Sequence, residues 1–344
     1  MAKDVTMDDI AIGLKISKSL VSRALSDSYG VSDEMRNKIK LTAINMGYKF
    51  KVKKRERFSQ TESITIIVER HDLLDSGFWV KIINGIGKEL NKKGISVFLS
   101  VIENDDEDTM PLSIKQMKTD GVLILGQIPL KHVISVSTSG LPIVLVDSLY
   151  SHLKFDHVMA NNYTGAYEAT EHLINHGHKR IGFVGAASYS YSFKEILRGF
   201  MDCIGSQSSN ELVSWQITDH FDDFETPFSI KQFKSVIVTQ ERPTALLCAN
   251  DISAFKVYEI LSEVGLKIPE DVSIIGFDNV PKSEWVSPPL STVHIPKTDM
   301  GERAVDLLIK RIENPDRSLE LVLVGTHLVK RESVKNIHEN KLRK

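Results

Sequence analysis

Residues 6–26 read TMDDIAIGLKISKSLVSRALS and predict two short helices joined by a tight turn. Thr6 can cap the first helix, because Asp9 follows it at the spacing of a capping box. Apolar side chains recur along this helix at helical spacing, at Met7, Ile10, Ala11 and Leu14. Residues 15–16 leave room only for a turn, and Ser17 can cap the second helix. The stretch therefore predicts a helical hairpin.

The second helix divides into an apolar arc and a polar arc at about 100° per residue. The apolar arc holds Leu20, Val21, Ala24 and Leu25. The polar arc holds Lys18, Ser19, Ser22, Arg23 and Ser26. Small hydroxyls beside a Lys and an Arg suit the major groove of DNA, because they reach phosphates and base edges without bulk. An ordinary amphipathic hairpin with a solvated face is the competing interpretation.

A third helix is predicted to begin at Ser32 and to end at Gly47, which is a common helix-terminating residue. Its inward-facing residues are Met35, Ile39, Ala43 and Met46. Three helices within 50 residues predict a helix-turn-helix domain over residues 1–48.

The charge of the chain is divided unequally along its length. Residues 1–60 carry 13 Lys and Arg against 7 Asp and Glu, a net charge of +6, whereas the whole chain carries −2. Six of these basic residues lie between Lys49 and Phe58, among them Lys54, Arg55 and Arg57. This asymmetry indicates a nucleic-acid-binding head on an acidic body. Residues 49–62 are interpreted as a basic hinge that lies along phosphates or, without DNA, as a solvated linker.

Length and composition favour a globular protein of more than one domain. The 344 residues are 42% hydrophobic and 26% charged, without an apolar run long enough to cross a membrane. The N-terminus lacks the apolar core of a signal peptide, so we expect a cytoplasmic protein without a membrane partner. The two cysteines, Cys203 and Cys248, are expected to be free and buried.

From residue 63 onward, apolar runs typical of parallel strands alternate with helical patterns. The strand candidates are 64–69, 96–101, 121–125, 143–146, 158–160, 180–184, 215–217, 245–249 and 272–277. The alternation predicts doubly wound sheets, and about five strands per lobe favour two lobes. Ligands of open parallel sheets bind beyond the carboxyl ends of the strands, so we expect a ligand in a cleft between the lobes.

The motifs of common enzymes are missing from the sequence. No GxGxxG follows a strand, and neither GxxxxGK[ST] nor GxSxG occurs. His176-Gly177-His178 is interpreted as a helix stop, because no third metal ligand lies nearby in the sequence. We therefore predict a protein that is not an enzyme, with no catalytic residues, cofactor or bound metal.

Several distinctive motifs follow one another along the chain. The first are TMDDIA (6–11) and SKSLVSRALS (17–26), and EHLINHGHKRIGF (171–183) comes next. They continue through residues 243–254, PEDVSIIGFDN (269–279), PPLSTV (288–293) and VKRES (329–333). Together these motifs cover roughly residues 5–335 and resemble, in this order, the LacI/GalR family of transcriptional regulators.

The resemblance implies a homodimer that binds a near-palindromic double-stranded operator, with one headpiece on each half-site. Lys18, Ser19 and Arg23 match the family's base-contacting positions. Thr6, Ser17, Ser22 and Tyr48 match positions that contact the DNA backbone. In the hinge, Arg57 occupies the place of a Leu that wedges into the minor groove in the family, so either Phe58 wedges or an Arg enters a narrow groove.

The resemblance also implies a body like that of periplasmic sugar-binding proteins. The effector-binding and dimerisation domain then spans residues 63–335, followed by a tail over 336–344. Its first lobe comprises about 63–160 and 292–324, and its second lobe about 161–291 and 325–335. Asn250 and Asp278 match polar effector contacts, and Phe78 or Trp79 matches an aromatic wall.

Two positions depart from the family's effector pocket. Ile196 stands where many members have an Arg, and Ser192 and Lys194 are candidates to replace that Arg. Asn161 stands where an Asp is usual. We expect a repressor of carbohydrate-utilisation genes controlled by a sugar or sugar derivative. A sugar-binding receptor without DNA binding, and a regulator that responds to a partner protein or a non-sugar metabolite, are the alternatives.

Overall fold

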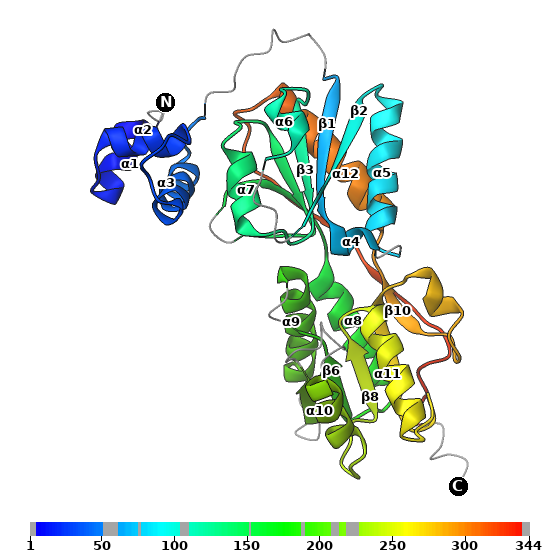
Figure 1. Cartoon of the computed structure of the whole chain (residues 1–344). Coiled ribbons are helices and arrows are strands. Elements are labelled where there is room, and N and C mark those ends of the chain that lie inside the picture. The colour runs from blue at the N-terminus through cyan, green and yellow to red at the C-terminus, as the bar shows by residue number, and fades with distance from the viewer. Residues whose placement is uncertain are drawn as a thin grey trace. The chain divides into compact units, whose positions relative to one another are not determined.

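The computed structural model describes residues 5–50, 61–74, 77–103, 110–150, 153–186, 190–207, 213–217 and 227–338. Contacts between residues divide the chain into two compact units (Figure 1). Unit 1 comprises residues 1–159 and 297–322, and unit 2 comprises residues 160–296 and 323–344.

The N-terminal helices of unit 1 form the headpiece, with the predicted caps. They are α1 (Met7–Leu14), α2 (Lys18–Leu25) and α3 (Asp33–Met46). Their shared core consists of Ile10, Ala11, Val21, Ala24, Ile39 and Ala43. The Ser32 side chain accepts a hydrogen bond from the Met35 amide, and Gly47 ends α3 with a φ of 80°. The three-helix prediction is confirmed, because each helix begins at its expected cap and buries its expected face.

Beyond the headpiece, the described residues of unit 1 contain a six-stranded sheet in the order β11-β5-β4-β3-β1-β2. Its strands are β1 (Ser63–Glu69), β2 (Ser96–Ile102), β3 (Gly121–Leu125), β4 (Ile143–Val146), β5 (Asp156–Ala160) and β11 (Leu321–Val324). Strands β1 to β5 pair in parallel, and the central β3 and β4 are buried along their whole length. This burial explains their almost wholly apolar sequences.

Helices cover both faces of this sheet (Figure 1). They are α4 (Arg70–Leu74), α5 (Trp79–Lys92), α6 (Leu112–Lys115), α7 (Leu130–Ser137) and α12 (Lys297–Glu313). On one face, α6 and α7 contribute Ile114, Val133 and Val136 to a core with Ile67 and Ile124.

Two glycines allow α5 and α12 to pack at close range. A Cβ on Gly85 would lie 2.2 Å from the Thr298 carbonyl oxygen, and one on Gly301 would lie 2.3 Å from that of Ile82. Any side chain at either position would therefore push the two helices apart. A buried ion pair also holds α12, since the Arg311 guanidinium donates two hydrogen bonds to the Asp156 carboxylate on β5, at 2.7 and 3.0 Å.

The sheet of unit 2 also has six strands within the described residues, in the order β12-β10-β9-β8-β6-β7. The strands are β6 (Arg180–Val184), β7 (Val213–Ile217), β8 (Ala245–Cys248), β9 (Ser273–Asp278), β10 (Ser291–His294) and β12 (His327–Val329). The helices are α8 (Asn162–Asn175), α9 (Tyr191–Gly205), α10 (Pro227–Ile237), α11 (Asp251–Glu263) and the 3₁₀ turn η1 (Pro281–Glu284). Among the described strands of this sheet, β12 alone runs antiparallel to its neighbour.

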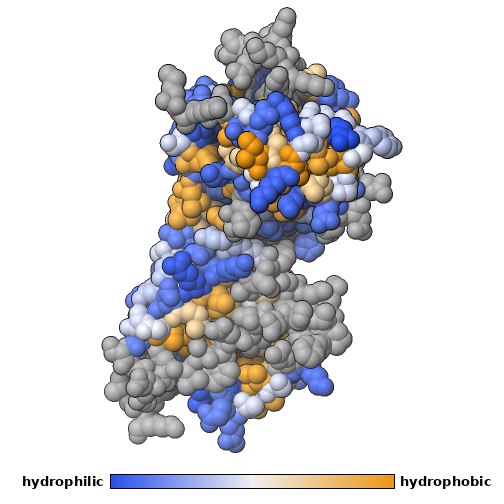
Figure 2. All heavy atoms as spheres, turned by 90° about the vertical axis from the view of Figure 1, so that its left-hand side faces the viewer, coloured by the Kyte–Doolittle hydropathy of each residue, from blue (hydrophilic) through white to orange (hydrophobic). Residues whose placement is uncertain are grey.

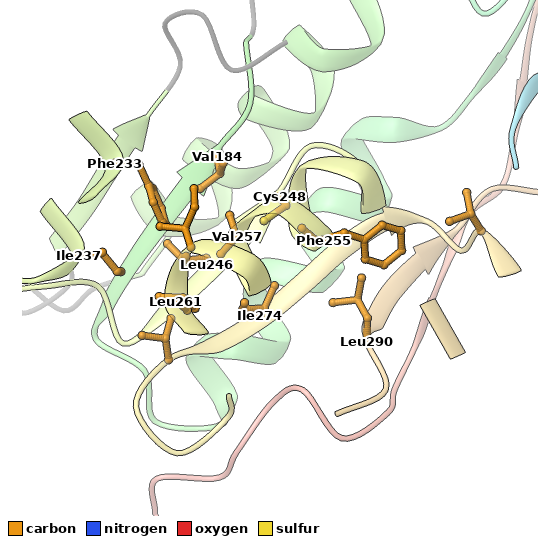
Figure 3. Close-up of a cluster of buried hydrophobic side chains, with 14 residues drawn as sticks. Val184, Phe233, Ile237, Leu246, Cys248, Phe255, Val257, Leu261, Ile274 and Leu290 are labelled. Atoms are coloured by element: carbon orange, nitrogen blue, oxygen red, sulfur yellow. The ribbon is translucent and has the colours of Figure 1, made fainter. Parts of the chain in front are cut away.

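A dense apolar core lies between this sheet and helices α10 and α11 (Figure 3). Val184, Leu246 and Ile274 project from three neighbouring strands, and Phe233 and Leu261 project toward them from the helices. Cys248 is fully buried in this core, and burial raises the pKa of its thiol well above the usual range. Cys203 is likewise buried, so both cysteines are free and buried as predicted.

The structure corrects the expected strand number and one expected boundary. Strands β10, β11 and β12 are only three or four residues long, and pairing with longer neighbours stabilises them. Residues 292–294 were expected in the first lobe. Instead, β10 pairs with β9 from Ser291 to His294, which keeps these residues in unit 2 until the chain returns to unit 1 at Lys297.

The edge strand β2 exposes apolar side chains. Val97, Leu99 and Val101 are 47%, 51% and 39% exposed, and their alternate spacing directs them to one side of the strand. On the face drawn in Figure 2, hydrophilic residues alternate with apolar patches among the described atoms. Within the described ranges, no helix is both long and apolar enough to cross a membrane.

Three histidines, of which His178 is buried, lie at and just after the end of α8, where His176 is the C-cap and Gly177 adopts a φ of 88°. The predicted helix stop is confirmed at this position. Burial, together with the charges of His176 and nearby lysines, lowers the pKa of His172 and of His178 to about 4. The His178 side chain is 2% exposed, and its Nδ1 lies 3.0 Å from the Thr244 hydroxyl. Both imidazoles are therefore neutral in the folded chain at pH 7.

These histidines predict a loss of stability in acid. An unfolded His binds a proton near pH 6.5, so the unfolded state binds more protons than the folded state as the pH falls from 6.5 to about 4. The free energy of unfolding should fall by up to about 1.4 kcal/mol per pH unit for each histidine. Replacing His178 by Gln should flatten this slope in urea unfolding measured between pH 7.5 and 5. His71→Gln, at a side chain 83% exposed, is the control, and equal slopes in the two variants would contradict the assignment.

Candidate nucleic-acid interface and effector site

Side-chain caps stabilise the N-termini of α1 and α2. The Thr6 hydroxyl accepts a hydrogen bond from the Asp9 amide at 3.3 Å, and the Asp9 carboxylate accepts one from the Thr6 amide at 2.8 Å. The Ser17 hydroxyl accepts one from the Leu20 amide at 3.2 Å. Both caps orient a helix N-terminus whose remaining amides suit an anion such as a phosphate.

A lysine occupies the left-handed position of the turn between these helices. Lys15 has a φ of 55° and a ψ of 44°, and its amide donates to the carbonyl oxygens of Ala11 and Ile12. A non-glycine residue in this conformation costs roughly 1 kcal/mol. Hydrogen bonds of the turn, such as that from the Ile16 amide to Ala11, hold the geometry despite this cost.

The polar arc of α2 is fully on the surface of the headpiece. Lys18, Ser19, Ser22, Arg23 and Ser26 are all exposed, while Val21 and Ala24 on the opposite side are completely buried. The Ser26 hydroxyl donates to the Ser22 carbonyl oxygen at 2.8 Å, so Ser26 is partly engaged within the helix. The structure therefore brings four of the predicted DNA-contacting residues, Lys18, Ser19, Ser22 and Arg23, to one free helix face.

An Arg that the sequence did not single out secures the C-terminal end of α2. Arg36 on α3 donates hydrogen bonds to the carbonyl oxygens of Ser28 and Val31, and to the Asp27 carboxylate at 3.3 Å. Lys40 reaches the same carboxylate at 2.6 Å. Asp27 itself has a φ of 51°. These contacts fix the loop after α2, in which Asp27, Ser28 and Gly30 are the turn-forming residues that the sequence offers.

The remaining predicted DNA contacts lie toward the hinge. Tyr48 is partly buried after α3, and its ring packs edge-on against Phe50 with centroids 5.2 Å apart. Lys54, Arg55 and Arg57, together with Phe58, lie outside the described residues.

The predicted aromatic wall lies at the carboxyl end of β1 in unit 1. Phe78 and Trp79 are only 6% and 8% exposed, with ring centroids 4.9 Å apart in a T-shaped arrangement. The Lys297 ammonium lies 5.5 Å from the centroid of Phe78. Trp79 covers Gly126 closely, since a Cβ there would lie 3.0 Å from the indole. Both rings are thus more enclosed than a simple sugar-stacking surface requires.

Three predicted effector residues share one edge in unit 2. Ser192 and Asn250 follow the carboxyl ends of β6 and β8, and Asp278 is the last residue of β9; these three strands are neighbours in the sheet. Asn250 caps α11 by accepting a hydrogen bond from the Ser253 amide at 2.8 Å. Ser192 is 6% exposed, and Asp278 is partly buried with a φ of 103°.

The other two predicted effector residues have different surroundings. Lys194 is exposed on α9, two residues beyond Ser192. Asn161 caps α8, and its amide oxygen accepts hydrogen bonds from the Thr164 amide and hydroxyl at 3.3 and 2.9 Å. This cap gives Asn161 a structural role that an Asp could fill equally well.

A buried carboxylate, which the sequence analysis did not assign, supports the edge of unit 2. Asp251 is completely buried and accepts hydrogen bonds from the Thr292 hydroxyl at 2.6 Å and the Val280 amide at 2.8 Å. Arg331 extends the network by donating to the Asn279 side-chain oxygen at 2.8 Å. The turn after β9 is therefore tied to two other segments, which fixes the backbone that carries Asp278. In the described parts of the chain, no cluster of three or more His, Cys, Asp or Glu side chains could hold a metal ion.

Comparison with known proteins agrees with this architecture. Residues 170–334 match the family described as a periplasmic binding protein-like domain. The chain is 30% identical over 344 residues to the HTH-type transcriptional repressor PurR of Mannheimia succiniciproducens, covering 96% of this chain and 99% of that protein. It is 29% identical over 335 residues to the ribose operon repressor of Haemophilus influenzae, covering 96% and 98% of the two chains.

A solved structure shares the fold over nearly the whole chain. The transcriptional regulator CelR in complex with cellobiose superposes with a TM-score of 0.68 and 22% identity, covering 96% of this chain and 99% of that one. The chain belongs to the LacI/GalR family of transcriptional regulators. Both relatives are named as repressors and not as enzymes. This confirms the prediction that the chain is a transcriptional regulator and not an enzyme.

Proposed function

We propose that this chain represses transcription by binding a near-palindromic operator through α2, and that a small effector controls its affinity for that operator. The observation that carries the proposal is the exposed face of α2, where Lys18, Ser19, Ser22 and Arg23 lie opposite the buried Val21 and Ala24. Two cations and small hydroxyls on one helix can donate to guanine and to phosphate oxygens in a major groove.

The caps add contacts to the DNA backbone. The N-termini of α1 and α2, at Thr6 and Ser17, present amides that stabilise a phosphate, and the net charge of +6 over residues 1–60 strengthens the attraction. Tyr48 and the basic hinge residues Lys54, Arg55 and Arg57 complete the proposed interface. The regulator would act in the cytoplasm, at the nucleoid when operator-bound.

The proposed operator and the exposed edge of unit 1 both support a homodimer. A near-palindromic site requires two headpieces related by a twofold axis. The exposed apolar side chains of β2, Val97, Leu99 and Val101, would be a liability in a monomer, because an open apolar edge strand invites pairing with another chain. We propose that a second copy of the chain covers this edge.

The effector is proposed to be a carbohydrate that binds at the carboxyl edges of the sheets. Asn250 and Asp278 offer an amide and a carboxylate, a suitable pair for neighbouring hydroxyls. The relatives named for a ribose operon and for a cellobiose complex support a sugar and control of carbohydrate-utilisation genes. A non-sugar metabolite is the second candidate, because a relative named PurR is similar at 30% identity. A partner protein is a third, because Ile196 replaces the pocket Arg of many members.

Effector control requires that the effector binds one state of the chain more tightly than another, and that these states differ in their affinity for the operator. The coupling free energy is then the same in both directions, so a ligand that weakens operator binding must itself bind more weakly to the operator complex.

Loss of the Arg23 guanidinium should weaken operator binding. Arg23→Ala should cost about 1–3 kcal/mol of binding to the duplex that the chain itself selects from a random DNA pool. Fluorescence anisotropy with the full-length chain measures this change. Arg303→Ala, at an exposed Arg of α12, is the matched control. Unchanged affinity in Arg23→Ala would exclude α2 as the reading helix.

The effector assignment predicts a selective loss of ligand response. Thermal-shift screening of pentoses, disaccharides, sugar phosphates and purine bases should reveal a stabilising ligand. Asp278→Ala should abolish that shift while preserving affinity for the selected duplex. Lys282→Ala, at an exposed residue of η1, is the control. A normal ligand response in Asp278→Ala would exclude the carboxyl edge of β9 as the effector site.

The proposed dimer depends on the exposed edge of β2. Leu99→Lys places a charge among Val97 and Val101 and should shift the sedimentation coefficient from dimer to monomer at micromolar concentration. Val238→Lys, at an apolar residue 58% exposed after α10, should sediment like the wild-type chain. A Leu99→Lys variant that remains dimeric would place the interface elsewhere.

A further inference from the structure

An acidic residue lies within the proposed DNA-binding surface. Asp8 is the second residue of α1, and its carboxylate lies 2.7 Å from the Lys18 ammonium at the start of α2. The two side chains are 57% and 61% exposed, so both can reach another molecule. A carboxylate in this place repels the phosphates of DNA, and this cost needs an explanation.

The helix itself does not require Asp8. The capping box of α1 is formed by Thr6 and Asp9, whose side chain and backbone groups bond reciprocally. Asp8 and Asp9 both place a negative charge in the first turn, where it complements the helix dipole, so Asp9 keeps that role when Asp8 is replaced. The short distance to Lys18 is therefore the distinctive feature of Asp8.

The two cations of α2 differ in their surroundings. Arg23, near the other end of the helix, has no carboxylate within ion-pair distance among the described residues, and its guanidinium lies against Gly30, where a Cβ would be 3.2 Å from Nη1. The Lys18 ammonium, in contrast, donates a hydrogen bond to the Asp8 carboxylate at 2.7 Å. A lysine has a flexible stem and a compact ammonium, so without a tether it can turn to the nearest phosphate oxygen.

We propose that Asp8 is a positioning residue that restrains Lys18 from non-specific phosphate contacts and thereby raises the dependence of binding on base sequence. This inference rests on the proposed DNA-binding function of α2. An exposed ion pair is weak, so a guanine edge in the correct position can still recruit the ammonium. On other sequences the ammonium stays with Asp8, and the phosphate contact that would stabilise a wrong complex is not made.

The test compares two duplexes in the full-length chain. The first is the duplex that the wild-type chain enriches from a random pool, and the second is a scrambled duplex of the same composition. The variants are Asp8→Asn, Lys18→Met, the double variant, and Asp33→Asn as a matched control. Asp33 is an exposed acid in the first turn of α3, so its removal changes the net charge equally.

In Asp8→Asn, affinity for the scrambled duplex should rise more than affinity for the enriched one, so their ratio should fall at least about threefold. The slope of log affinity against log salt on scrambled DNA should steepen by about 1 for each headpiece, because the released Lys18 displaces one more counterion. Neither change should occur when Asp8→Asn is made in the Lys18→Met background, and Asp33→Asn should leave the ratio intact.

Two results would overturn the inference. One is an unchanged ratio and salt slope in Asp8→Asn, and the other is an equal change in the Lys18→Met background, which would make Asp8 a general negative charge. If the wild-type chain enriches no duplex at all, the proposed operator binding itself fails, and the inference fails with it.

Discussion

Burial of one face of α2 is the interaction on which the proposed interface depends. Val21 and Ala24 are completely buried against Ile10 and Ile39. Each large apolar side chain removed from water in this way contributes roughly 1.5–3 kcal/mol. Lys18 and Arg23 lie on the opposite side of α2, so the burial of Val21 and Ala24 leaves these two side chains exposed. The headpiece core therefore determines which side chains can meet a second molecule.

Side-chain caps connect the fold of unit 2 to its proposed ligand edge. Asn250 caps α11, Ser190 caps α9, and each lies just beyond the carboxyl end of a parallel strand. A cap must point its oxygen at the helix N-terminus, so its orientation is set before any ligand arrives. The buried Asp251 then ties the next turn to Thr292, which keeps the edge rigid. Structural and ligand-binding roles thus fall on adjacent residues.

Charge placement distinguishes this headpiece from a merely basic surface. Arg36 and Lys40 both pair with Asp27 in the loop after α2 and stabilise that loop. Asp8 pairs with Lys18 at the N-terminal end of α2. Only some of the positive charge of residues 1–60 is therefore available to phosphates. A net charge alone predicts attraction to DNA, but the ion pairs decide how strongly each cation contributes.

The sequence by itself determined the three headpiece helices, their caps, the buried arc of α2 and the alternation of strands and helices in the body. These features depend on local spacing and hydrophobic periodicity, which are readable along the chain. Only the tertiary structure decided the short strands β10, β11 and β12, the return to unit 1 at Lys297, and the contacts of Asp251, Arg36 and Asp8. Those features depend on contacts between different helices, strands and loops, for example at a separation of ten residues for Asp8 and Lys18 and of 41 for Asp251 and Thr292. Hydrophobic periodicity within one element does not identify such partners, so they become identifiable only when the chain has folded.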